Sequence, residues 1–283
     1  GCSLCLGEDA PWAPKGYEQM HGQRVFRVSG ATETLKGDVR IVPGDWNVGA
    51  FAGGVSALIS LPEGGLTSYR KDGGPELIVT PFQLSLFRAP TDTDRGGGFD
   101  RDMAFWRAAT ECSKLADVRP SLPGEPPKIT FRYALPIVKD AFADIAYQML
   151  PDGAVRVLLD LPGVPGMGPV PAVGLSVRLP SRFCKARYYG MGPEENYIDR
   201  LAGARLGVYA MGAAQNLTRY VVPQECGNRA GVRWLEVTDE GGAGLRVETD
   251  GAPLEISVLP YTAGELARAL HPDELPPITY TVL

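Results

Sequence analysis

Alternation of apolar and polar residues, bounded by turn residues, restricts the fold of this chain more than any other feature of the sequence. Ile145, Tyr147 and Met149 share one face of a predicted strand, and the alternation resumes over residues 155–161. Pro151-Asp152-Gly153 separates the two runs, and such residues favour a turn because proline presets φ and glycine accepts positive φ. We therefore predict a β-hairpin at this point.

Similar runs recur along the chain, and each predicts a strand. They cover residues 25–28, 55–61, 77–81, 129–135 and 173–179, with a three-stranded meander over 235–238, 245–249 and 254–259 and a last run over 275–283. With 35 glycines and 25 prolines in 283 residues, the composition fits many strands joined by many turns. We predict a large antiparallel β protein of the sandwich type.

Two helices are predicted. Thr262 and Glu265 have the spacing of a capping box, which predicts a helix over 263–270 that ends before His271-Pro272. A second short helix is predicted over 100–108.

The chain divides into two unequal parts. Residues 1–30 are too few to form a stable domain alone, so we expect the last strands of a preceding domain or an arm on the main domain. Residues 31–283 form the main domain.

Composition excludes several classes of function. The net charge is −5, the pI is about 5.2 and no Lys/Arg run is present, so we expect no nucleic-acid partner. No apolar stretch of about 18 residues is present, so we expect no membrane span. The N-terminus lacks a signal pattern, and we expect a cytoplasmic protein.

Five widely spaced cysteines argue against a disulfide framework, and a zinc site is not expected because Cys2-x-x-Cys5 has no second pair and only two histidines are present.

Residues 188–200 form the densest cluster of functional groups. A plain turn needs Gly, Pro or Asn, but this tract also contains acids, an arginine and tyrosines. We expect a loop that holds side chains in fixed places. Its candidate residues are Glu195, Asn196, Asp199 and Arg200, and we expect the acids to pair with Arg200 or Arg229.

A second tract covers residues 87–98 and contains Arg88, Asp92, Asp94, Arg95 and Gly97. The two aspartates lack the further oxygen ligands that a calcium loop needs. The three consecutive glycines lack the Lys-Ser/Thr of a phosphate loop. A mobile loop and a plain polar turn both remain open.

The third tract covers residues 220–229. It is either a strand leaving a sheet edge or a segment whose Glu225, Asn228 and Arg229 bond to the 188–200 tract. Hydrolysis of a glycoside needs two carboxylates about 5–10 Å apart. Glu194, Glu195, Asp199 and Glu225 are available, and no spacing in the sequence selects two of them.

Taken together, these tracts resemble one family. Four motifs carry the resemblance, and they occur in the order Gly65-Leu66-Thr67-Ser68-Tyr69, Arg88-Ala89-Pro90-Thr91-Asp92-x-Asp94, Gly190-Met191-Gly192-Pro193-x-Glu195-Asn196-Tyr197-x-Asp199-Arg200 and Tyr220-x-x-Pro223-Gln224-Glu225-x-Gly227-Asn228-Arg229. In this order they resemble the C-terminal part of the large bacterial β-galactosidases of glycoside hydrolase family 2. It is also similar to the small subunit of the two-chain members. Residues 8–30, with Trp12-Ala13-x-x-Gly16-Tyr17-Glu18, resemble the closing strands of the immunoglobulin-like domain that precedes this part.

This resemblance implies a β-supersandwich similar in fold to galactose mutarotases. It implies that the catalytic glutamates lie in a TIM barrel outside these residues, and that any Mg or Na of the whole enzyme is bound outside this chain. The implied partners are that barrel, as a domain or a large subunit, and a galactoside substrate.

The resemblance assigns roles near the substrate or in loop ordering to a set of residues. These are Arg88, Asp92, Asp94, Arg95, Gly97, Glu195, Asn196, Asp199, Arg200, Glu225, Asn228 and Arg229. Residues 95–100 match by position a mobile loop that this domain lends to the active site, and here the loop is shorter and richer in glycine. Thr93 stands where the family usually has Asn.

Two other functions stay open. The chain could be a stand-alone carbohydrate-binding module in which Trp106 or Tyr197 contacts sugar. It could also be a mutarotase-like epimerase, which would need a well-placed histidine, either His21 or His271.

Overall fold

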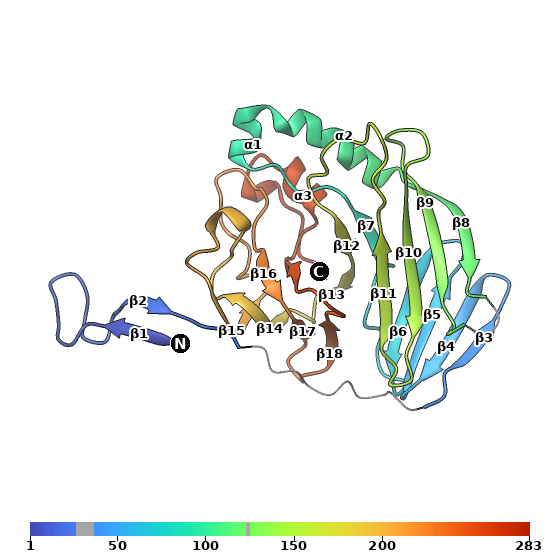
Figure 1. Ribbon diagram of the computed structural model, residues 1–283, viewed down its shortest axis with the longest axis horizontal. Coiled ribbons are helices and arrows are strands. Elements are labelled where there is room, and N and C mark those ends of the chain that lie inside the picture. Colours follow the sequence, from blue (N-terminus) through green and yellow to red (C-terminus); the bar gives the residue numbers. More distant parts are fainter. Residues whose placement is uncertain (27–36, 123–124) are drawn as a thin grey trace.

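Three four-stranded sheets contain most of the strands of the computed structural model, which describes residues 1–26, 37–122 and 125–283 (Figure 1). Every strand pairing in this described part is antiparallel. The predicted all-β sandwich architecture is therefore confirmed.

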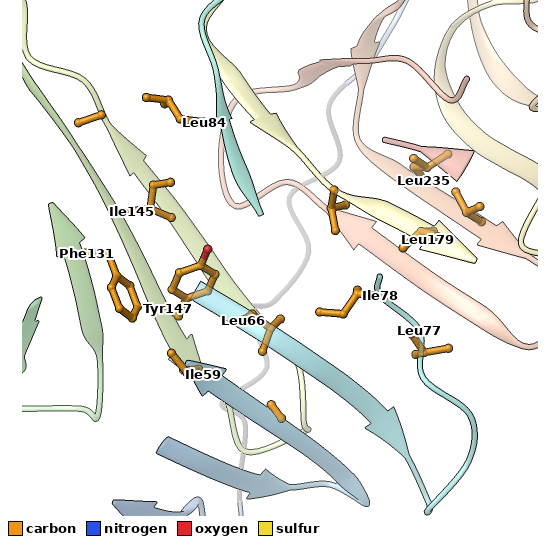
Figure 2. Close-up of a cluster of buried hydrophobic side chains, with 14 of the residues drawn as sticks. Ile59, Leu66, Leu77, Ile78, Leu84, Phe131, Ile145, Tyr147, Leu179 and Leu235 are labelled. Atoms are coloured by element: carbon orange, nitrogen blue, oxygen red, sulfur yellow. The ribbon is translucent and has the colours of Figure 1, made fainter. Parts of the chain in front are cut away.

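Two of the sheets pack against each other on the right of Figure 1. One has the order β3-β4-β5-β6, with bounds Arg40–Pro43, Asn47–Ala52, Val55–Ser60 and Gly65–Lys71. The other has the order β11-β10-β9-β8, with bounds Val155–Asp160, Phe142–Met149, Ile129–Ala134 and Lys114–Pro120. Phe131, Ile145 and Tyr147 from the second sheet are fully buried beside Ile59 and Leu66 from the first (Figure 2).

The third sheet continues the same core. Its order is β15-β14-β17-β18, with bounds Arg205–Gly212, Lys185–Gly192, Trp234–Thr238 and Gly244–Glu248. Three short pairs surround it, and they are β7 (Gln83–Ser85) with β12 (Gly174–Ser176), β13 (Arg178–Pro180) with β20 (Tyr280–Val282), and β16 (Arg229–Val232) with β19 (Leu254–Ile256). Leu179 and Leu235 join this region to the main cluster (Figure 2).

The hairpin predicted at Pro151-Asp152-Gly153 is present between β10 and β11. Gly153 has φ +90°, a conformation that favours glycine. A Cβ at this position would lie 2.7 Å from the carbonyl oxygen of Ala52, so the turn also needs glycine for space.

The helices lie along one end of the sheets (Figure 1). They are α1 (Asp92–Gly97), α2 (Phe99–Glu111) and α3 (Ala263–Arg268), with short 3₁₀ turns η1 (Ile198–Arg200) and η2 (Pro272–Glu274). The capping box of α3 is confirmed, and α2 extends beyond its predicted bounds. None of the helices in the part of the chain that the structure describes has the length and hydrophobicity needed to cross a membrane.

The loop predicted after Asp92 is wrong, because residues 92–97 form α1. The Thr91 side chain accepts a hydrogen bond from the Asp94 N–H, and the Asp94 side chain accepts one from the Thr91 N–H. This reciprocal cap offsets the low helix propensity of the glycines. Gly98, with φ +78°, then separates α1 from α2.

Three strand predictions were also wrong. Residues 77–81 form no strand, because the N–H groups of Leu77 and Val79 bond to two different segments, at Tyr69 and at Arg178. The run 173–179 divides into β12 and β13. The predicted meander has only two consecutive strands, because β19 pairs with β16 and not with β18.

The N-terminal residues form a hairpin of β1 (Cys2–Cys5) and β2 (Glu18–Gly22), which extends away from the main body (Figure 1). Glu18 forms an ion pair with Arg205 at 2.6 Å, and the Gln23 side chain exchanges two hydrogen bonds with the backbone of Leu206. The strand predicted at 25–28 is absent at Val25 and Phe26, and its remainder lies outside the described residues. The domain boundary at residue 30 also lies there and stays a prediction.

Truncation of Phe131 tests the central packing. We expect Phe131→Ala to lower the free energy of unfolding by about 3–5 kcal/mol, because the ring is fully buried between two sheets. Leu158→Ala on strand β11 of the same sheet is the control, and we expect it to cost less than about 1 kcal/mol because Leu158 is half-exposed. Urea titrations of both variants measure this difference, and equal losses would contradict the assigned core.

Candidate functional site

The three functional tracts meet in one hydrogen-bonded cluster. The Asp92 N–H donates to Gln224 Oε1 at 2.6 Å, which joins the start of α1 to the third tract. The Asn196 N–H donates to the Asn228 carbonyl at 2.9 Å, which joins the 188–200 tract to the third. Segments that are far apart in sequence therefore form one site.

Arg88 and Asp94 form a two-bonded ion pair at one side of the cluster. The guanidinium nitrogens lie 2.5 and 3.0 Å from the two carboxylate oxygens. Thr91 adds its backbone N–H at 2.8 Å and its hydroxyl at 2.9 Å. Burial opposes ionisation of Asp94, but these donors outweigh it and lower its pKa to about 2. Asp94 is thus a fixed anion that orders the start of α1.

Arg95 connects α1 to the third tract. Its guanidinium donates to the Pro223 carbonyl at 3.1 Å and to the exposed Asp92 carboxylate at 3.3 Å. Gly97 is the last residue of α1, and a Cβ there would lie 3.0 Å from the Phe99 ring. Arg95 therefore ties α1 to the third tract, and Gly97 provides the space that the Phe99 ring occupies.

Glu195 is the most heavily bonded carboxylate of the cluster. It accepts hydrogen bonds from Arg200 at 2.7 Å, Thr218 at 2.9 Å, Tyr220 at 3.2 Å and the Gly227 N–H at 2.5 Å. Burial alone would raise the pKa of Glu195, but the bonds from Gly227 and Arg200 outweigh it and lower that pKa. The structure thus contains the expected acid–arginine pair within the 188–200 tract.

Asp199 behaves differently from Glu195. Its side chain is exposed, and within the described residues it has no ion pair. The prediction that either acid pairs with an arginine therefore holds for Glu195 alone.

Asn196 and Asn228 interlock in the buried centre. Asn196 is 1% exposed; its side-chain amide donates to the Met191 and Glu194 carbonyls, and its Oδ1 accepts from the Ala230 N–H at 2.9 Å. Asn228 Nδ2 donates to the Asn196 carbonyl at 2.9 Å. Because these buried polar groups are satisfied, the two loops are fixed to each other.

Arg229 is a buried cation without a carboxylate partner among the residues that the structure describes. It is 5% exposed, its Nε donates to the Tyr188 hydroxyl at 2.9 Å, and another guanidinium nitrogen donates to the Gly227 and Asn228 carbonyls. The expectation that acids of the 188–200 tract pair with Arg229 is thus wrong, because neutral oxygen atoms surround this charge instead.

Glu225 is the one carboxyl of the cluster whose pKa is raised. Burial raises its pKa to about 7, although the charge of Arg88 and the hydrogen bond from Tyr197 oppose this. The Tyr197 hydroxyl donates to Glu225 Oε1 across a long 3.4 Å. Glu225 therefore changes charge near neutral pH, whereas Asp94 and Glu195 stay ionised.

The chemistry of the remaining groups is limited. Within the described ranges, no group of three or more His, Cys, Asp or Glu side chains is placed to hold a metal ion. Burial raises the pKa of the Cys226 thiol to about 11, so it is a poor nucleophile. The cluster is therefore suited to holding loops in fixed positions.

The structure adds partners that the sequence interpretation missed. Tyr188, Thr91, Thr218, Tyr220 and Gln224 all bond to predicted residues. The spacing of Thr91 and Asp94 is a capping-box signal that could have identified Thr91. The others are brought in by long-range contacts.

Comparison with known proteins identifies the family. Residues 52–283 match the family described as Beta galactosidase small chain, and the chain belongs to that family. It is 35% identical to a β-galactosidase of Halalkalibacterium halodurans, over 99% of this chain and 28% of that protein. It is 36% identical to β-galactosidase BgaC of Bifidobacterium adolescentis, over 96% of this chain and 27% of that protein.

A third relative is much shorter. The chain is 27% identical to a β-galactosidase small subunit of Latilactobacillus sakei, over 86% of this chain and 85% of that protein. This chain thus spans about a quarter of the first two relatives and most of the third. The resemblance inferred from the four motifs is confirmed at the level of the β-galactosidase small chain.

The raised pKa of Glu225 predicts a pH-dependent stability. Its ordinary pKa is 4.5 and its folded value is about 7, so its contribution to stability is complete below pH 4.5 and is lost as the pH rises through 7. Between pH 5 and pH 8 we expect the wild-type chain to lose about 1–2 kcal/mol more than Glu225→Gln. Urea unfolding of both chains at four pH values measures this, and parallel pH profiles would contradict it.

Glu195 and Asp199 form a matched pair for mutation. In Glu195→Gln, an amide NH₂ group replaces one carboxylate oxygen and faces groups that also donate hydrogen bonds. We therefore expect a loss of about 2–4 kcal/mol in unfolding free energy. Asp199→Asn is the control, and we expect a change within about 0.5 kcal/mol because that side chain is exposed. If both variants unfold at the same denaturant concentration, Glu195 does not hold the cluster together.

Proposed function

We propose that this chain is a non-catalytic C-terminal part of a β-galactosidase of glycoside hydrolase family 2. It packs on the catalytic barrel, present as a domain or a large subunit, and helps to shape the site where terminal β-D-galactosides are hydrolysed. The observation that carries the proposal is its match to the small-chain family over about a quarter of the length of whole β-galactosidases.

The chemistry of the cluster favours a supporting role. Hydrolysis of a glycoside needs one carboxylic acid and one carboxylate on opposite sides of the scissile bond. Asp94 and Glu195 are each bound by several donors, which stabilise the charge and occupy the oxygen atoms. The pKa of Glu225 is raised to about 7, which suits a general acid. Its carboxyl group is nevertheless engaged within the cluster, because Tyr197 donates a hydrogen bond to it and the charge of Arg88 acts on it.

The N-terminal hairpin fits the same proposal. Leu4, Trp12, Tyr17 and Met20 are exposed on it, and an isolated two-stranded hairpin is marginally stable in water. We assign this hairpin to the closing strands of a preceding immunoglobulin-like domain.

We also propose that any Mg or Na of the whole enzyme binds outside this chain, and that the enzyme is located in the cytoplasm.

The two alternative functions have less support. Trp106 is buried against the core, so its ring is not available to stack on sugar as a binding module would require. His21 lies on the N-terminal hairpin beside Glu18, and His271 is exposed beside Glu274, so the ion-pair partner of each histidine lies outside the polar cluster.

Activity of the purified chain tests the proposal. We expect no hydrolysis of p-nitrophenyl β-galactoside by the chain alone, and hydrolysis once the catalytic remainder of the enzyme is added. Turnover by the pure chain that Glu225→Gln abolishes would replace the proposal with catalysis by this chain itself. Loss of millimolar galactose binding in Tyr197→Ala would instead favour the binding module.

A further inference from the structure

Two aliphatic side chains beside the Glu195 network lie almost entirely in solvent. Ile198 in η1 is 90% exposed and Val221 is 83% exposed, the highest values among large hydrophobic side chains in the described part of the chain. Single exposed hydrophobic residues are common, but two near one ordered polar cluster indicate a contact surface.

The backbone that presents these side chains is fixed. Ile198 is two residues from Arg200, which bonds to Glu195 at 2.7 Å and lies 4.9 Å from the centre of the Tyr197 ring. Val221 follows Tyr220, whose hydroxyl also bonds to Glu195. A single carboxylate therefore binds side chains of both segments, one of which carries Ile198 and the other Val221.

A charged residue lies within two positions of each aliphatic residue in the sequence. Asp199 and Arg219 are exposed, and neither forms an ion pair with a residue that the structure describes. The surface thus presents two apolar groups with one negative and one positive charge beside them. This combination of apolar anchors and a charged rim is typical of protein interfaces.

We propose that Ile198 and Val221 anchor the docking surface for the catalytic remainder of the same β-galactosidase, with Asp199 and Arg219 facing opposite charges on it. The occupant follows from length, because nearly three-quarters of each whole relative lies outside the part that this chain matches. This inference rests on the proposed function and adds the contact face to it. The Glu195 network then preorganises a surface for association.

The test uses the chain and the catalytic remainder of the enzyme, produced as two separate polypeptides. Isothermal titration calorimetry measures the Kd, and restored galactosidase activity reports assembly. We expect Ile198→Asp and Val221→Asp each to raise the Kd at least tenfold and to leave the melting temperature of the free chain unchanged. Leu158→Asp, a half-exposed residue on β11, is the matched control and should bind like the wild type.

The possible outcomes separate the two proposals. Wild-type affinity in both variants overturns the docking surface and leaves the proposed function intact. No association of the wild-type chain overturns both. Self-association of the free chain that Ile198→Asp abolishes assigns the surface to a second copy instead. If an aspartate variant fails to fold, the double variant Ile198→Ala and Val221→Ala is used, and unchanged affinity there also overturns the proposal.

Discussion

The carboxylate of Glu195 is the constraint on which the rest of the site depends. Four donors from three stretches of chain converge on its two oxygen atoms, and one of them is the backbone N–H of Gly227. The N–H of Gly227, which is buried, would need another acceptor if this group were lost, because a buried unpaired donor is costly. Glu195 therefore determines where η1 and the third tract lie relative to each other.

The cluster combines groups with opposite preferences for charge. Asp94 and Glu195 are stabilised as anions by donors, whereas burial favours the protonated form of Glu225. The positive charge of Arg229 is balanced by the dipoles of a hydroxyl and two carbonyls. Such a network fixes geometry more than it adds stability, because each charge also carries a desolvation cost. Precise loop placement is what an interface beside an active site requires.

Local features of the sequence predicted much of the fold. Alternation identified β10 and β11, and the glycine of their turn, because these depend on neighbouring residues. The pairing of β19 with β16 could not be predicted, since it depends on contacts between distant strands. Of the two alternatives left open for the third tract, hydrogen bonding to residues 188–200 is present. Its contact with Asp92 and the partner of Arg229 depend on which atoms surround these groups in three dimensions. At α1, a local capping signal was present and the glycines obscured it.

The bond between Asp92 and Gln224 joins residues 132 positions apart, and this separation has a consequence for the order of folding. The sheet β3-β4-β5-β6 and the hairpin of β10 and β11 need only nearby residues and can form early. Forming the polar cluster closes long loops of the chain, which costs conformational entropy. This cost is offset only when the third tract is present to form its hydrogen bonds. During synthesis, the face that carries Ile198 and Val221 therefore takes shape only after residue 229 has left the ribosome, later than the sheet β3-β4-β5-β6 and the hairpin of β10 and β11.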